Sequence, residues 1–300
     1  MNKTQISFNK FYKLFNLISI ILIFVSLVLL LFKGLNYGVD FKGGTLIELR
    51  SKDTQITISK LRQSLMNMNL GDVSVKQFGN QNDYLIKFEK KDTTNPNLIN
   101  EIKVDLIKSI GPGFDFRRVE SVGPKVSLEL LKSGIIAIGL SLAAMLFYIW
   151  IRFEWQFSLG AIIALFHDVI ITLGIFSLFS LEINLSIVAA VLTIVGYSMN
   201  DTVVIFDRVR ENLKKLSDIK IFELTNISIN ETLSRTIITS ITTLLALLSI
   251  YFFGGETLKG FSLAMILGVI FGTYSSIYIA NPILVSLRVS QKTILKEDKD

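Results

Sequence analysis

Long apolar runs, interrupted by charged segments, dominate the hydropathy pattern of the chain. Six apolar stretches lie at residues 14–32, 133–151, 157–179, 183–206, 236–253 and 261–285. Each has about 18 residues or more, enough for a helix to cross a hydrocarbon core of about 30 Å, where the backbone must satisfy its own hydrogen bonds. The pattern therefore predicts a polytopic α-helical membrane protein with six transmembrane helices.

The segment between the first two apolar stretches, residues 33–132, has a different pattern. Short β-rich runs at 45–50, 72–78, 84–89 and 115–122 alternate with helical patterns at 59–68 and 96–109. The order β-α-β-β-α-β is that of a ferredoxin-like unit. We therefore expect a small α+β (ferredoxin-like) domain between helices one and two, a scaffold that implies no chemistry by itself.

The distribution of lysine and arginine predicts the orientation. Residues 1–13, 152–156, 207–235 and 286–300 together carry 14 Lys or Arg, whereas the short opposite loops 180–182 and 254–260 carry only Lys259. Positive charge favours the cytoplasmic side. We therefore expect a cytoplasmic N-terminus (1–13), cytoplasmic loop (207–235) and cytoplasmic tail (286–300), with 33–132 on the outer, periplasmic side.

The composition of the chain mainly excludes other classes of protein. The net charge of +6 follows from the topology, and the basic residues form no continuous stripe with aromatics, so we expect no nucleic-acid partner. The chain has no cysteine and one histidine, and its glycine-rich segment 38–45 lacks the spacing of a phosphate loop. We expect no enzyme activity, no catalytic residues, no metal and no cofactor, so energy must come from an ion gradient or a partner.

Ionisable residues inside the apolar stretches are the candidate chemistry. The third helix carries His167 and Asp168, and the fourth carries Asp201, preceded by Tyr197 and Asn200 on a shared face. A charged group at a helix centre costs about 2.5–3.5 kcal/mol on insertion scales, so such groups are usually functional. The alternative is that they only hydrogen-bond helices together, and for His167 and Asp168 both interpretations stay open.

Arg235 opens the fifth helix and heads a polar stripe at helical spacing, which contains Thr236, Thr239, Ser240 and Thr243. An apolar environment favours the neutral form of a carboxyl, whereas a guanidinium nearby favours the ionised form. If the stripe faces Asp201, alternation between these environments would make a proton switch. Alternatively, Arg235 is an interfacial residue that only extends its side chain towards water.

Small residues recur every four positions along the sixth helix, at Ala264, Gly268, Gly272, Ser276 and Ala280. Such a face allows two helices to approach closely. We interpret it as a packing surface.

Four sequence blocks resemble a known family. They are GVDFKGGT at 38–45, ALFHDVIIT at 164–172, VGYSMNDTVVIFDRVREN at 195–212 and SRTIITSITT at 234–243. The third block is long and specific, and the likeness spans residues 14–288. With its six apolar stretches, the chain resembles the SecD/SecF family of bacterial protein-export membrane proteins.

The resemblance implies a function that spacing alone does not. Members are similar in architecture to half of an RND-type exporter and act in the inner membrane with SecD, the SecYEG translocon and a translocating unfolded polypeptide, driven by a proton gradient. The family's proton-transport pair falls on Asp201 and Arg235 here. His167, Asp168, Tyr197, Asn200, Thr239 and Thr243 would be supporting polar groups among helices in contact with membrane lipid. The alternative is a half-size RND-like proton-coupled exporter.

Overall fold

A computed structural model describes residues 6–52, 56–68, 70–71, 73–77, 82–88, 98–216 and 219–295. The chain divides into two compact units. One combines Met1–Asn36 with Ile136–Asp300, and the other is Tyr37–Ile135.

Helices long and apolar enough to cross a membrane form most of the first unit, and six of them are present in the described residues. This confirms the predicted six-helix architecture. A short 3-10 turn (η1, Phe8–Phe11) leads into the first helix, and a π-helical turn (η2, Ser276–Ala280) follows α9. The six membrane-length helices are α1 (Tyr12–Phe32), α5 (Pro124–Arg152), α6 (Trp155–Leu178), α7 (Leu185–Lys215), α8 (Ile221–Phe253) and α9 (Gly255–Ser275), and the last of them continues through η2 into α10 (Asn281–Ser286). The short helix α11 (Gln291–Leu295) follows.

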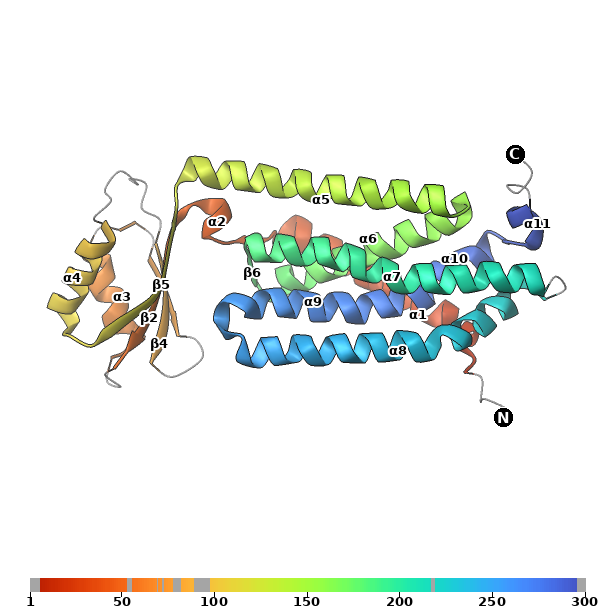
Figure 1. Cartoon of the computed structure of the whole chain (residues 1–300). Helices are drawn as coiled ribbons and strands as arrows, with labels where there is room; N and C mark the ends of the chain where they lie inside the picture. Colours follow the sequence, from red (N-terminus) through yellow and green to blue (C-terminus); the bar gives the residue numbers. More distant parts are fainter. Residues whose placement is uncertain are drawn as a thin grey trace. The chain divides into compact units, whose positions relative to one another are not determined.

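The helices differ in how much of their surface they bury. α6, α7 and α9 are largely buried, whereas α1, α5 and α8 expose most of their side chains. The buried residues of α7 recur every three to four positions, as in Ile187, Val191, Ile194 and Ser198, so one face points into the bundle. α7, α8 and α9 run side by side in Figure 1. Apolar side chains exposed on α1, α5 and α8 suit contact with lipid.

Close approach of α7 and α9 depends on the small residues predicted to form a packing surface. Gly268 lies against Ile194, and a Cβ added at Gly272 would lie 3.1 Å from the Cα of Ser198. Ala264 and Ala280 are fully buried as well. The packing interpretation of this stripe is confirmed.

The second unit has the predicted ferredoxin-like order. Its elements are β2 (Gly44–Ser51), α3 (Ile58–Met66), β3 (Val73–Gln77), β4 (Asp83–Phe88), α4 (Leu98–Ile110) and β5 (Phe114–Val122), preceded by a short helix, α2 (Val39–Lys42). The strands form an antiparallel sheet in the order β3-β4-β2-β5. The predicted helix start at residue 96 and the strand ends at 72, 78 and 89 lie outside the described residues.

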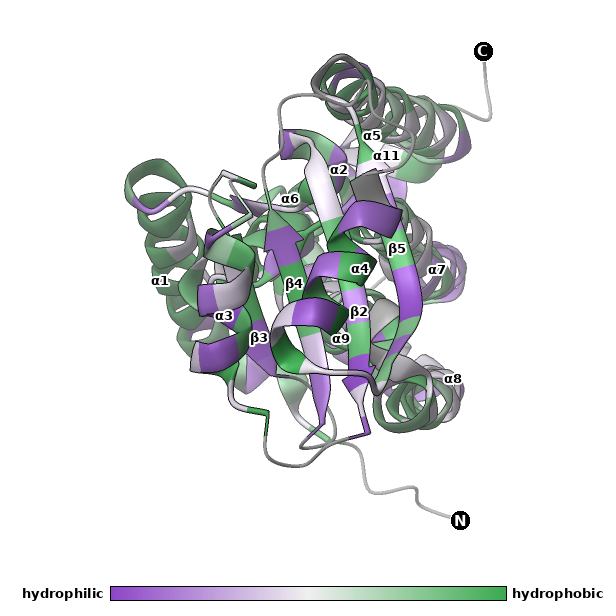
Figure 2. Cartoon of the chain, turned by 90° about the vertical axis from the view of Figure 1, so that its left-hand side faces the viewer, coloured by the Kyte–Doolittle hydropathy of each residue, from purple (hydrophilic) through white to green (hydrophobic). Residues whose placement is uncertain are grey.

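Alternation along the strands separates the two faces of this sheet. Ile47 pairs with Ile86, and both side chains are fully buried with Leu61 of α3 and Leu106 of α4. Figure 2 shows the resulting mixture of hydrophilic and hydrophobic positions along β2 and β5, whereas α1 is hydrophobic almost throughout. Side chains two residues apart along a strand point to the same face, so alternate positions of these strands form the core of the domain.

Two glycines form the connection from α2 into β2. Gly43 has φ +80° and Gly44 has φ +123°. Residues with a side chain rarely adopt these values, so the chain needs glycine at both positions to enter the sheet.

The remaining short strands are β1 (Asn36–Tyr37) and β6 (Glu182–Ile183).

The segment 207–235, predicted to be a loop, is mostly helical. α7 continues to Lys215 and α8 begins at Ile221. Charged residues continue the helix beyond its apolar part because they pair along it: Glu211 accepts from Arg208 at i−3 and from Lys215 at i+4. Loss of hydrophobicity therefore marked the end of the apolar stretch and not the end of the helix.

Candidate functional site within the helix bundle

Asp201 lies on the buried face of α7, with 4% of its surface exposed. It follows Ser198 by one turn on the face that packs against α9. Thr273 of α9 donates a hydrogen bond from Oγ1 to Asp201 Oδ2 at 3.4 Å, and its hydroxyl lies 2.8 Å from Ser240 Oγ of α8. A chain of polar atoms therefore joins α7, α9 and α8 at this carboxyl.

Arg235 lies on the neighbouring helix α8 with an exposed side chain. Within the described part of the chain, no acidic side chain lies within ion-pair distance of its guanidinium. Arg235 lies on the same helix as Ser240, the hydroxyl that contacts the Asp201 partner Thr273. The structure therefore places the predicted pair in one region of the bundle without direct contact.

The polar stripe of α8 faces Asp201 only in part. Ser240 reaches the carboxyl through Thr273, whereas Thr239 donates to the backbone oxygens of its own helix at Arg235 and Thr236. Thr243 is half-buried. Thr236 Oγ1 on α8 is a buried hydroxyl with no hydrogen-bond partner among the described residues, and Tyr197 OH on α7 is another. Buried hydroxyls of this kind are places where water can bind.

Asn200 does not share the buried face of Asp201, contrary to the sequence prediction. Asn200 is exposed on α7, whereas Asp201 is buried. Consecutive residues lie about 100° apart around a helix, so Asp201 can face the interior while Asn200 faces outward. Gly196, one turn before Asn200, also opens onto free space. A polar amide thus lies on the outer surface of an apolar span.

His167 and Asp168 form a separate cluster. Both are fully buried on α6, and their side chains are 2.8 Å apart between Nδ1 and Oδ1. Asp168 Oδ2 accepts hydrogen bonds from Ser198 of α7 and Ser275 of α9. Among the described residues, no hydrogen bond joins this cluster to Asp201.

Sequence reasoning did not select four hydroxyl groups of the site. Ser198 and Ser275 contact Asp168, Thr273 contacts Asp201, and Ser19 of α1 contacts His167. Serine and threonine are common in membrane helices, and these four come from three helices. Only Ser198 had a signal, because it lies within the block at 195–212.

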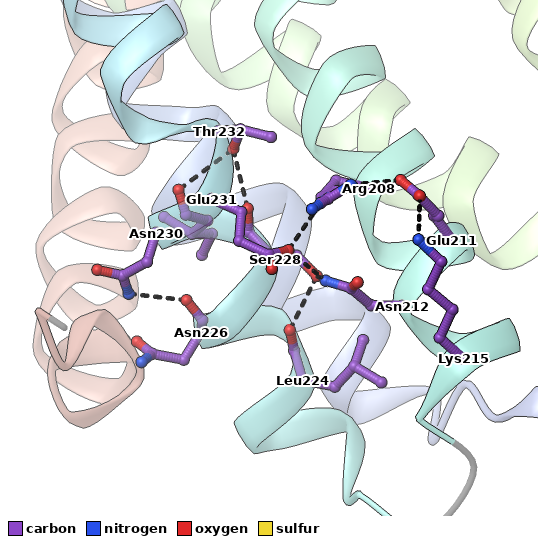
Figure 3. A network of polar contacts seen from close by, with 11 residues as sticks. Arg208, Glu211, Asn212, Lys215, Leu224, Asn226, Ser228, Asn230, Glu231 and Thr232 are labelled. Atoms are coloured by element: carbon purple, nitrogen blue, oxygen red, sulfur yellow. Dashed lines mark hydrogen bonds and ion pairs between the residues drawn. The ribbon is translucent and has the colours of Figure 1, made fainter. Parts of the chain in front are cut away.

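A second polar network joins α7 and α8 where the predicted loop became helix (Figure 3). Arg208 donates from Nε to Glu231 at 2.7 Å, and the buried Asn212 donates to Ser228 Oγ at 3.0 Å. The network also contains Glu211, Lys215, Leu224, Asn226, Asn230 and Thr232. These contacts hold the part of α8 that leads to Arg235.

The segment before α1 holds the other side of α8. Asn226 Oδ1 accepts from the Phe8 backbone at 2.8 Å. The Asn230 amide bonds both to the Ile6 N–H, at 2.9 Å, and to its carbonyl, at 2.8 Å. α8 is therefore fixed between the N-terminal segment and α7 before it reaches the region of Asp201.

Two family models match the chain. The model described as "Protein export membrane protein SecD/SecF, C-terminal" matches residues 102–290, and "SecD/SecF GG Motif" matches residues 28–55, which include Gly43 and Gly44. The chain belongs to the SecD/SecF family. Relatives in this family include "Protein translocase subunit SecF" of Cereibacter sphaeroides, 44% identical over 94% of this chain and 89% of the relative. The protein of the same name from Rickettsia bellii is 46% identical over 94% of this chain and 93% of the relative.

Solved structures of SecD/SecF proteins have the same fold. SecDF of Thermus thermophilus, described as a translocon-associated membrane protein, matches 95% of this chain with a TM-score of 0.85 and 35% identity. SecDF in a super-membrane-facing form matches 100% with a TM-score of 0.71 and 32% identity. The chain spans only 39% and 41% of those two SecDF chains.

Proposed function

We propose that the chain is an accessory subunit of the Sec protein-export machinery that uses the proton gradient to promote late steps of polypeptide translocation. Membership of the SecD/SecF family supports the export role, as do the relatives named protein translocase subunit SecF. The observation that carries the proton coupling is the buried carboxyl of Asp201, which contacts the Thr273 hydroxyl and lies on a helix packed against α8, the helix that carries the cation Arg235.

The site can alternate between two electrostatic states. Asp201 is stable as a neutral acid when only the hydroxyls of Thr273 and Ser240 are near, and as a carboxylate when the guanidinium of Arg235 approaches. One proton that crosses 100 mV releases about 2.3 kcal/mol. This exceeds the roughly 1.4 kcal/mol that changes an equilibrium tenfold, so one proton can shift a two-state conformational change.

We further propose that a homologous six-helix subunit, SecD, covers the surface that carries Asn200 and Arg235. Asn200 is exposed on an apolar span and Arg235 is exposed directly before one, where contact with lipid is costly. The SecDF chains, of which this chain matches about two fifths, contain additional sequence that could supply such a partner. The pair would act with SecYEG in the bacterial inner membrane, with the α+β domain in the periplasm near the emerging polypeptide and with both termini cytoplasmic. The proposed role involves no covalent chemistry and no cofactor.

The test replaces Asp201 in vesicles reconstituted with SecD and SecYEG. Asp201→Asn should abolish gradient-dependent stimulation of translocation and proton flux, while co-purification with SecD stays unchanged. Asp207→Asn is the matched control, since Asp207 is an exposed carboxylate on the same helix that pairs with Arg152. Normal gradient-dependent translocation in Asp201→Asn would refute the proposal.

Arg235→Lys tests the second member of the pair. Lysine keeps the charge but loses the planar guanidinium and its five donors. We expect most of the gradient-dependent stimulation to be lost. Full activity of the lysine variant would instead support the interfacial interpretation of Arg235.

A further inference from the structure

A second buried carboxyl, Asp168, lies in the same bundle and has no place in the proposed relay. Its Oδ1 is 2.8 Å from His167 Nδ1, and its Oδ2 accepts from Ser198 Oγ at 2.6 Å and from Ser275 Oγ at 2.8 Å. Both oxygens therefore have partners. Neither Asp168 nor His167 exposes more than 1% of its surface.

The hydrogen bonds beyond His167 identify which of its nitrogens carries a proton. Tyr274 OH donates to the Phe15 carbonyl at 2.8 Å, and a carbonyl can only accept. The Tyr274 oxygen therefore accepts from the Ser19 hydroxyl, 2.8 Å away. Because this uses the only hydrogen of Ser19, its oxygen must accept from His167 Nε2, at 3.2 Å. His167 therefore carries a proton on Nε2.

One further proton lies in the short contact between His167 Nδ1 and Asp168 Oδ1. It either belongs to Asp168, as a neutral acid beside a neutral imidazole, or to His167, as an imidazolium beside a carboxylate. The pair has no net charge in both cases. A pair without net charge, with every donor matched to an acceptor, can lie in an apolar interior at much lower cost than a lone carboxylate.

The two serines that contact Asp168 come from the helices that form the Asp201 site. Ser198 precedes Asp201 by one turn of α7, and Ser275 follows Thr273, the hydrogen-bond donor to Asp201, by two residues. Asp168 Oδ2 therefore fixes α7 against α9 beside the contact that sets the environment of Asp201.

We propose that Asp168, as an electroneutral pair with His167, is a positioning residue that sets the register of α7 and α9 around Asp201 and does not itself carry protons. The proposal rests on the proposed role of Asp201. A positioning role for Asp168 and a proton-carrying role for Asp201 require different surroundings, and the two carboxyls have different surroundings. Asp168 is saturated with partners, whereas buried hydroxyls without partners among the described residues, Tyr197 OH and Thr236 Oγ1, lie on the helices that carry Asp201 and Arg235.

Asparagine is the discriminating substitution because it reproduces the neutral acid. In Asp168→Asn, the amide nitrogen donates to His167 Nδ1 and the amide oxygen accepts from both serines, but the side chain cannot bind or release a proton. Asp168→Leu has similar size and leaves two serine hydroxyls and the imidazole without their partner. A positioning role predicts gradient-dependent translocation within about twofold of the unsubstituted protein for asparagine, and a loss of about tenfold or more for leucine.

The register of α7 and α9 is measured separately by cross-linking, since the chain has no cysteine of its own. Thr202 Oγ1 and Ser276 Oγ are 2.7 Å apart, so the pair Thr202→Cys and Ser276→Cys should form a disulfide on oxidation. We expect the cross-linking yield to be retained with Asp168→Asn and to fall with Asp168→Leu.

Two results would overturn the proposal. One is an Asp168→Asn variant that cross-links normally but loses gradient-dependent translocation, because Asp168 would then carry protons. The other is an Asp168→Leu variant that keeps both activity and cross-linking. Asp201→Asn is measured in parallel, and activity in that variant would refute the proposed function, while the cross-linking result would still decide whether Asp168 sets the register.

Discussion

The contact between α7 and α9 gives a quantitative prediction for Gly268→Ala. A Cβ at Gly268 would lie 2.3 Å from Cγ1 of Ile194, 2.7 Å from Cδ1 and 3.0 Å from Cγ2. Non-bonded carbon atoms pack best at about 3.5–4.0 Å, so Ile194 or the helix must move. Ile194 is completely buried, and its side chain lies directly against Gly268. We therefore expect the methyl group to force the two helices apart.

The size of the effect follows from two opposing contributions. Overpacking a well-packed interior costs about 1–3 kcal/mol. Alanine is favoured over glycine in a helix by about 1 kcal/mol, which offsets part of this cost. The matched control is Gly196→Ala on α7, since nothing lies within 4 Å of the added Cβ there. The control should be neutral or slightly stabilising, so the difference between the two variants is the overpacking cost of about 1–3 kcal/mol.

The free energy of unfolding would be measured in mixed detergent micelles for both variants. Ile194→Ala, combined with Gly268→Ala, removes the three atoms that clash and should show a favourable coupling energy in a double-mutant cycle. If Gly268→Ala is as stable as Gly196→Ala, the reasoning about this contact is wrong.

Three further predictions concern other parts of the chain. Burial and the like charge of neighbouring lysines lower the pKa of Lys87 from 10.5 to about 8. Between these pH values the unfolded chain binds more protons than the folded chain, so the stability of the α+β domain should rise from pH 8 to pH 10.5. Thermal unfolding should show this rise, and the rise should vanish in Lys87→Met. Arg50→Ala removes a bidentate partner from the buried carboxylate of Asp83 and should lower the free energy of unfolding of the α+β domain, whereas an unchanged value in chemical denaturation would contradict the structure. Asn212→Leu removes a buried donor to Ser228 and should lower the free energy of unfolding by about 1–3 kcal/mol in detergent, while an unchanged value would show that the contact is dispensable.

Local pattern was sufficient for most of the fold. The apolar stretches predicted the six membrane helices, and short runs of alternating or β-branched residues predicted the strands of the α+β domain. Spacing of four predicted the packing stripe around Gly268 and Gly272. These features depend on residues near one another in the sequence, so periodicity reveals them.

Helix ends and side-chain directions were harder to predict from the sequence. The loop predicted at 207–235 is helical because Arg208, Glu211 and Lys215 stabilise the turns that follow the apolar part of α7. Asn200 and Asp201 were assigned to one face, although they point to different sides of α7. The first error arises because hydropathy reports how a segment partitions and not where its helix ends. The second arises because adjacent residues, about 100° apart around a helix, need not share a face.

The sequence alone determined that this protein crosses the membrane six times, carries a ferredoxin-like domain after its first helix, and has rare ionisable groups at His167, Asp168 and Asp201. Only the tertiary structure decided how those groups differ. It gave Asp168 partners from α6, α7 and α9, and it left Asp201 next to Thr273 with Arg235 at a distance. The physical reason is that the environment of a buried carboxyl depends on atoms from other helices, whose positions result from packing between segments far apart in the chain.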